Sequence, residues 1–196
     1  MRLGLAIALL VLASGATARA KTVEVDFEGI LSLASGIAGA DAGTGFSGSY
    51  SYDDGAALQL LGPGSGMYSF GSGFPASGFR IAIHGTSPVE FSGAPLRDIS
   101  VTDADSGDSL AVVAETGANG DFRLDLMGGA GLLPSLGLGA PDLSQGSGLL
   151  QYTNLESGFV LLMGSLTSLA VVPEPPDSLL LALGIAALAV RQRKRS

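Results

Sequence analysis

The chain has 196 residues, no cysteine and a formal net charge of −8 at pH 7. Without cysteine there can be no disulfide bond, thiol nucleophile or thiolate metal site, so packing alone must stabilise the fold. The length suits a single domain. The content of 30 glycines and 9 prolines indicates a turn-rich body, below the level at which composition predicts disorder.

The first twenty residues have the order of a secretory signal peptide. Arg2 precedes an apolar run from Leu3 to Leu12, and small residues follow before Lys21. A basic start, an apolar middle and a small-residue cleavage site are typical of exported proteins, so we expect the Sec machinery as a partner. The predicted cut follows the Ala18 and Ala20 pair, with a second Ala-x-Ala ending at Ala18. A buried N-terminal helix is the alternative.

The body between Lys21 and Val172 is strongly acidic. It holds four basic and sixteen acidic residues, a net charge of −12. Such a surface repels nucleic acids and anionic membranes, so we expect no nucleic-acid partner.

Short segments of alternating apolar and polar residues predict an all-β body. In residues 22–29, Val23, Val25 and Phe27 alternate with acidic residues, which is the period of a half-buried strand. Further strands are predicted at 46–52, 57–61, 67–70, 79–84, 97–102, 110–115, 122–127 and 159–169. Their spacing favours an antiparallel β-sandwich or jelly roll. Residues 30–42 have some helical character, weakened by interior glycines, and 128–148 read as a long loop.

One acidic turn is a candidate cation site. Asp103, Asp105 and Asp108 lie within six residues that also contain a glycine. Carboxylates on alternate residues of a tight turn can converge on Ca²⁺, although the spacing is not that of an EF-hand. The alternative is a solvated acidic hairpin turn, with no cofactor bound.

The body offers no set of residues for catalysis. His84 is the single histidine, and Ser87, its nearest serine, precedes a proline outside any nucleophile-elbow pattern. One histidine cannot make a multi-histidine zinc site. We therefore expect that the protein is not an enzyme. A group of aromatic residues can form either a sugar-stacking platform or part of the core, and core packing is favoured: Tyr50, Tyr52, Tyr68, Phe70, Phe74 and Phe79.

The C-terminal segment 171–196 has three parts in order. Pro173 and Pro175 keep the first part extended, because proline fixes φ and lacks a backbone donor. An apolar run from Leu179 to Val190 follows, and we expect a helix over 178–190. Its apolar part reaches only about 18 Å, short of the roughly 30 Å hydrocarbon core. The last part is a basic cluster that favours a cytoplasmic end: Arg191, Arg193, Lys194 and Arg195.

This segment resembles the PEP-CTERM sorting signal of exported Gram-negative bacterial proteins. The motif is Val172-Pro173-Glu174-Pro175, followed by the apolar run and the arginine-rich end. The resemblance implies recognition by an exosortase, a transient inner-membrane anchor, and delivery to the cell surface or exopolysaccharide matrix. A softer resemblance to the ectodomains of such proteins comes from F-S-G-S-Y-S-Y-D at Phe46 and G-S-L-T-S-L at Gly164.

The sequence therefore predicts a signal peptide (1–20), a β-sandwich ectodomain (21–170) and a PEP-CTERM segment (171–196). The leading hypothesis is a non-catalytic surface or matrix protein with a structural or adhesive role in exopolysaccharide or biofilm. One alternative is a carbohydrate-binding module that uses Ca²⁺. Another is a surface protein retained in the membrane by an uncut tail.

Overall fold

The computed structural model describes residues 21–70, 77–116, 120–133, 135–137 and 141–172. This part of the chain forms ten strands and one short 3-10 helix, η1 (Leu143–Gln145). The strands are β1 (Thr22–Ala34), β2 (Gly45–Asp53), β3 (Leu58–Gly62), β4 (Ser65–Ser69), β5 (Gly78–Ile83), β6 (Val89–Thr102), β7 (Asp108–Glu115), β8 (Gly120–Gly128), β9 (Gly146–Asn154) and β10 (Val160–Val172).

Eight of the strands close into an antiparallel barrel. The order is β1-β2-β5-β6-β7-β8-β9-β10, and β10 pairs with β1 to complete the circuit. Each barrel strand thus lies beside its neighbours in the chain, with the β3–β4 hairpin inserted between β2 and β5. That hairpin attaches to the barrel through β4, which pairs with the second half of β6. Closure gives each barrel strand two neighbours, although parts of β6 and β10 pair on one side only, and it leaves β3 as the terminal strand of the sheet.

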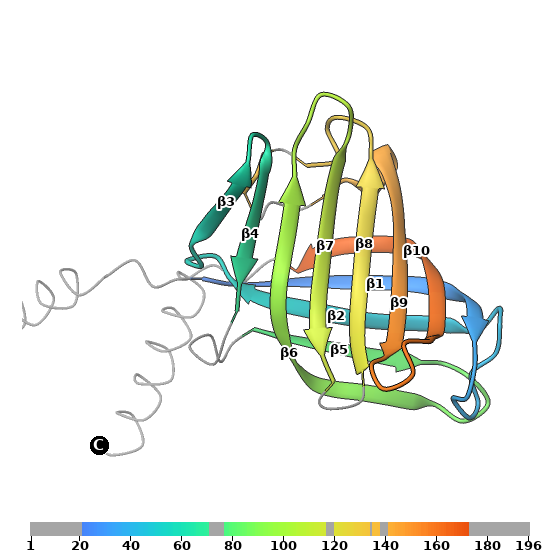
Figure 1. Ribbon diagram of the computed structural model, residues 1–196. Helices are drawn as coiled ribbons and strands as arrows, with labels where there is room; N and C mark the ends of the chain where they lie inside the picture. Colours follow the sequence, from blue (N-terminus) through green and yellow to red (C-terminus); the bar gives the residue numbers. More distant parts are fainter. Residues whose placement is uncertain (1–20, 71–76, 117–119, 134, 138–140, 173–196) are drawn as a thin grey trace, which may run out of the picture.

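The barrel is flattened into two crossing layers (Figure 1). Strands β7, β8 and β9 stand upright in one layer, while β1, β2 and β5 run across behind them. The long strands β6 and β10 bend and take part in both layers. Register shifts lie at these bends, between Leu96 and Asp98 in β6 and between Leu166 and Ser168 in β10. Such bulges let one strand bend from one layer into the other while it stays hydrogen-bonded to its neighbours.

A chain of aromatic rings fills the barrel and joins the two layers. Phe27 contacts Phe79 with ring centroids 5.5 Å apart, and Phe79 stacks on Phe122 at 5.3 Å. Phe122 in turn packs on Tyr152 at 4.7 Å. Aliphatic residues from every barrel strand but β2 surround these rings, so the described residues fill the barrel with a packed core.

The predicted all-β class is confirmed, and each of the nine predicted segments contains a strand. Two strand regions were missed: β9, and the first half of β6, where glycine and exposed residues interrupt the alternation. Residues 30–34 continue β1 instead of starting a helix. The β-sandwich or jelly-roll arrangement is not confirmed, because the sheet closes and its strands follow chain order. A jelly roll needs Greek-key crossovers between two separate sheets.

Both ends of the body emerge at the same place. Glu24 near the start of β1 pairs with Val172 at the end of β10. The predicted signal peptide, with Ala18 and Ala20, and the predicted C-terminal helix lie outside the described residues. Each barrel strand has both of its neighbours within residues 22–172, so the barrel is closed by strands of this segment alone.

Glycines at close approaches allow the large rings to lie flat against the sheet. A Cβ atom on Gly48 would overlap the Phe27 ring and the backbone carbonyl oxygen of Arg80. Gly29 and Gly164 make the same kind of room for Phe46. The cost of a side chain at these positions is overpacking of a filled core.

We therefore expect Gly48→Ala to lower the free energy of unfolding by about 2 kcal/mol. Gly62→Ala is the matched control in another strand, because nothing lies within 4 Å of the Cβ that it would add. The control should change stability by less than about 0.5 kcal/mol. Urea titrations of the two variants, followed by circular dichroism, measure both values. Equal losses of stability in the two variants would show that packing of the Phe27 ring does not require a glycine at position 48.

Candidate functional sites

The outer face of β1, β2 and β5 carries three rows of polar residues across the strands. β1 contributes acids, β2 contributes serines, and β5 contributes one arginine among small residues. From strand to strand the rows read Glu24-Ser51-Gly78, Asp26-Ser49-Arg80 and Glu28-Ser47-Ala82, the last extended by Glu90 on β6. The short serine side chains leave a shallow trough between the longer residues of β1 and β5.

Arg80 divides this trough into two depressions. Its Nε donates to the buried Ser49 Oγ at 2.7 Å, and its Nη2 pairs with Glu24 at 3.0 Å. On one side lies a depression of about 360 Å³, lined by residues that include Asp26, Glu28 and Glu90. A smaller one of about 240 Å³ lies on the other side. We call the two together the serine trough. Its hydroxyl, carboxylate and guanidinium groups can donate to and accept from a polar ligand.

Ser47, which lines the serine trough, also belongs to a Ser–His pair that the sequence did not reveal. Ser47 Oγ lies 2.8 Å from His84 Nε2, at hydrogen-bonding distance. His84 directly follows β5, as expected for a residue at the end of a strand, and is exposed. A nucleophile and its base need a third group to orient the base. The contacts of the described residues show no carboxylate on the histidine ring.

Asp108 has a structural role at the end of the barrel. Although only 3% exposed, its carboxylate accepts hydrogen bonds from the backbone N–H groups of Gly131 at 2.8 Å and Leu133 at 3.0 Å. The Ala104 N–H adds a longer contact of 3.4 Å. These donors hold the pKa of Asp108 below its usual range, with Leu133 the largest contributor. The bonds tie the β6–β7 turn to the loop that follows β8.

That loop closes one end of the barrel. Leu132 and Leu133 are fully or almost fully buried in the core, although they lie outside any strand. Leu136 packs against the same core, and its carbonyl oxygen accepts from the Tyr68 hydroxyl at 3.0 Å. Part of the segment predicted as a long loop is therefore a plug that Asp108 holds in place.

The acidic turn does not gather its three carboxylates around one point. Asp103 and Asp105 are exposed, whereas Asp108 faces inward to the plug loop. Among the described residues, no group of three or more histidine, aspartate or glutamate side chains is arranged to hold a metal ion. Calcium binding by Asp103, Asp105 and Asp108 stays a prediction, and it would compete with the backbone contacts of Asp108.

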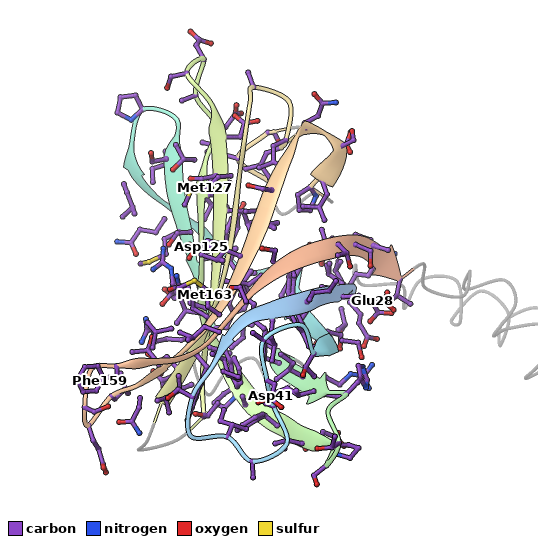
Figure 2. All side chains as sticks on the ribbon, turned by 90° about the vertical axis from the view of Figure 1, so that its right-hand side faces the viewer. Glu28, Asp41, Asp125, Met127, Phe159 and Met163 are labelled. Carbon is purple, nitrogen blue, oxygen red and sulfur yellow. The ribbon has the colours of Figure 1, made fainter. Side chains whose placement is uncertain are left out.

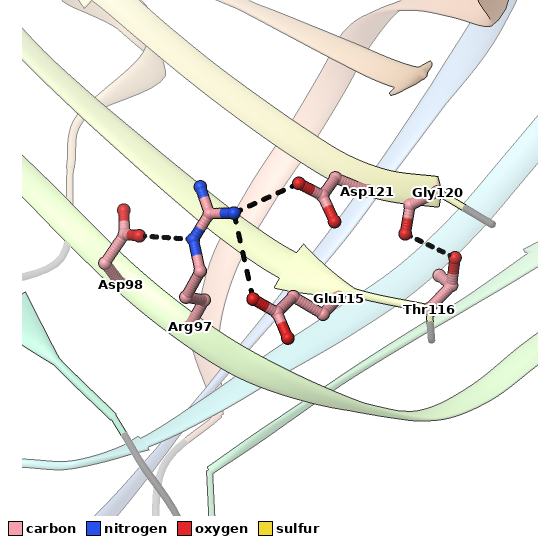
Figure 3. Close-up of polar contacts among 6 residues, drawn as sticks. All are labelled: Arg97, Asp98, Glu115, Thr116, Gly120 and Asp121. Carbon is pink, nitrogen blue, oxygen red and sulfur yellow. Dashed lines mark hydrogen bonds and ion pairs between the residues drawn. The ribbon is translucent and has the colours of Figure 1, made fainter. Parts of the chain in front are cut away.

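A second charged cluster lies on the outside of β6, β7 and β8 (Figure 3). The bulge in β6 places Arg97 and Asp98 on the same face, joined by a 2.8 Å ion pair. Arg97 also contacts Asp121 at 3.1 Å and Glu115 at 3.8 Å. One guanidinium thus offsets three carboxylates from three strands, which limits repulsion on an acidic surface.

The predicted sugar-stacking aromatics belong to the core. Five of the six are described, and each is at most 7% exposed: Tyr50, Tyr52, Tyr68, Phe70 and Phe79. Burial, with a smaller contribution from Asp54, raises the pKa of Tyr52 to about 12. Phe74 lies outside the described residues. The prediction that these aromatic residues pack in the core is therefore confirmed for these five.

Most of the predicted sorting residues lie outside the described part of the chain. Val172 is the last residue of β10. The other motif residues and the basic cluster follow it: Pro173, Glu174, Pro175, Arg191, Arg193, Lys194 and Arg195. No helix within the described ranges has the length and hydrophobicity to span a membrane. A comparison with protein families, with curated proteins and with solved structures finds no match for this chain.

The anchoring role of Asp108 predicts a pH dependence. Because the native state lowers its pKa, Asp108 stabilises the fold above the unfolded value of about 4, and this contribution is lost as the pH falls further. Asp108→Asn should therefore lower the melting temperature at pH 7, and the gap to the unsubstituted protein should narrow below about pH 4.

Thermal melts from pH 3 to pH 7, followed by circular dichroism, measure this gap. Asp105→Asn is the control, since Asp105 is an exposed residue of the same turn. A gap of equal size for both variants, or one that does not change with pH, would contradict the anchoring role.

Proposed function

We propose that this protein is exported and that an exosortase cuts it at Val172-Pro173-Glu174-Pro175. The acidic barrel then remains as a non-catalytic component of the cell surface or exopolysaccharide matrix. In this proposal the signal peptide directs the chain to the Sec machinery, and the C-terminal segment holds it briefly in the inner membrane.

The observation that best supports the proposal is the position of the two predicted cuts relative to the barrel. β1 begins at Thr22 and β10 ends at Val172, so the predicted cuts fall just outside both strands. Removing both targeting segments takes away none of the pairings that close the sheet. The ends also lie side by side, which leaves the rest of the barrel surface away from the membrane attachment.

Two features of the body support a structural role over a catalytic one. Among the described residues, aromatic and aliphatic side chains pack the barrel interior into a core instead of lining a substrate pocket. The Ser47–His84 pair lies on an open face, where water competes for each of its polar groups. Catalysis depends on enclosed, oriented groups that this pair does not have among the described residues.

The mass of the mature protein tests the proposal. We expect the form isolated from the producing cells to begin at or near Lys21 and to end at or near the motif. Intact-mass spectrometry measures both ends at once. A mature protein that still extends to Ser196 would overturn the processing and favour a membrane-retained surface protein instead.

Two variants test whether processing depends on the prolines of the motif or on the loss of any proline in the chain. Pro173→Ala combined with Pro175→Ala should leave the tail uncut, because the extended motif is lost. Pro88→Ala, an exposed proline between β5 and β6, should be processed normally. Equal processing of the double variant and of Pro88→Ala would show that the protease does not recognise the motif.

The serine trough favours carbohydrate binding as a second candidate function. Its hydroxyls, carboxylates and single arginine can pair with sugar hydroxyls, while the described aromatics that would stack on a sugar ring are buried. Binding of this kind would rely on hydrogen bonds and on repeated contacts along a polymer.

Calorimetry of residues 21–172 with polysaccharide from the producing cells tests this candidate. Binding in the trough should weaken severalfold in Asp26→Asn and be unchanged in Asp105→Asn. Binding that requires added CaCl₂ and weakens in Asp105→Asn would locate the site at the acidic turn. No heat in either condition would rule out carbohydrate binding.

A further inference from the structure

β3 is the terminal strand of the described sheet, and one of its two edges is unpaired along its whole length. It pairs with β4 on one side and is the last strand in the sheet order. Figure 1 shows it as the outermost strand, beyond β4 and β6. In an antiparallel strand every second residue directs its N–H and C=O groups to the outer side. These unpaired groups form a template for another strand.

The side chains of β3 add an apolar surface to this edge. Leu60 is 67% exposed and Leu61 is 60% exposed, both near the end of the hairpin. Leu58 instead packs against the core. The outer half of β3 therefore presents two large apolar residues together with free backbone groups.

The hairpin also lacks the usual protection of an edge strand. Proteins commonly block such edges with lysine, inward charges or proline. Residues 56–70 contain no charged residue, in a body that carries a net charge of −12. Pro63 lies in the turn after β3, and a register shift follows Leu60. The proline and the irregular register therefore affect the tip of the hairpin and do not block the rest of the β3 edge.

We infer that β3 is a self-association edge that pairs with β3 of a second copy. An antiparallel pair of identical strands is related by a two-fold axis, so each copy supplies the groups that the other lacks. The neutral hairpin is a part of the surface through which two acidic bodies can approach with little repulsion. The pairing would extend two closed barrels into one continuous sheet.

The association is weak in dilute solution because five residues make a small contact. We expect a dissociation constant on the order of 100 µM. Copies held on one surface or in one matrix reach millimolar effective concentrations, at which such a contact is occupied. The inference does not depend on how the chain is exported, and it concerns the folded body alone.

Sedimentation of residues 21–172 over a range of concentrations tests the inference. We expect reversible dimers that increase with added NaCl, because salt screens the repulsion between acidic bodies. Leu60→Lys should weaken dimerisation by roughly tenfold or more, as lysine does on natural strand edges. The added positive charge reduces the net negative charge, so the loss cannot come from greater repulsion.

Leu155→Lys is the matched control, because Leu155 is 54% exposed and belongs to the β9–β10 turn. Figure 2 labels Phe159, another exposed apolar residue of the same turn. Leu155→Lys also replaces an exposed leucine by lysine, but away from β3, so it should leave dimerisation unchanged. Circular dichroism confirms that both variants stay folded. A protein that remains monomeric at about 1 mM, or dimers that weaken only in Leu155→Lys, would overturn the inference.

The absence of cysteine allows a direct measurement of the contact. Leu60→Cys places one thiol at the centre of β3, where two-fold pairing brings the two copies close enough for a disulfide. Mild oxidation should give dimers with this variant and not with Leu155→Cys. The reverse result would place the contact on the β9–β10 turn and contradict pairing through β3.

Discussion

The pairing of β1 with β10 is the interaction on which the rest of the structure depends. These strands come from opposite ends of the body, and their ladder runs from Glu24 opposite Val172 to Ala34 opposite Leu162. Without it the eight strands would form an open sheet with two long edges. With it the core is enclosed, and the two chain ends leave the barrel together. The position of the proposed processing sites beside a complete domain follows from this one ladder.

Closure also explains how the outer surface is organised. Because the inside is filled by packed rings, polar chemistry is confined to the outer faces and the turns. The three arginines of the body pair there with carboxylates. Asp108 is the exception among the acids, since its buried carboxylate holds the plug loop through backbone donors. The uncharged β3–β4 hairpin gives this acidic body the edge through which we propose that it self-associates.

The arrangement of the candidate sites could not be predicted from the sequence, because it depends on contacts between distant segments. Asp103, Asp105 and Asp108 stand close in the sequence, which made a shared cation plausible. The fold separates them, because Asp108 begins β7 and turns toward a loop more than twenty residues away. The Ser47–His84 pair and the serine trough have no sequence signature at all. Their members come from β1, β2, β5 and β6, and only the register of these strands brings them together.

The sequence by itself determined the properties that depend on neighbouring residues. Alternation of apolar and polar positions predicted the all-β class and most strands, and the counts of cysteine and charge excluded whole classes of site. Tertiary structure alone decided the closed barrel, the burial of Leu132 and Leu133, the role of Asp108 and the open edge of β3. Each of these depends on contacts between distant segments, and local periodicity carries no information about which distant strand a given strand will pair with.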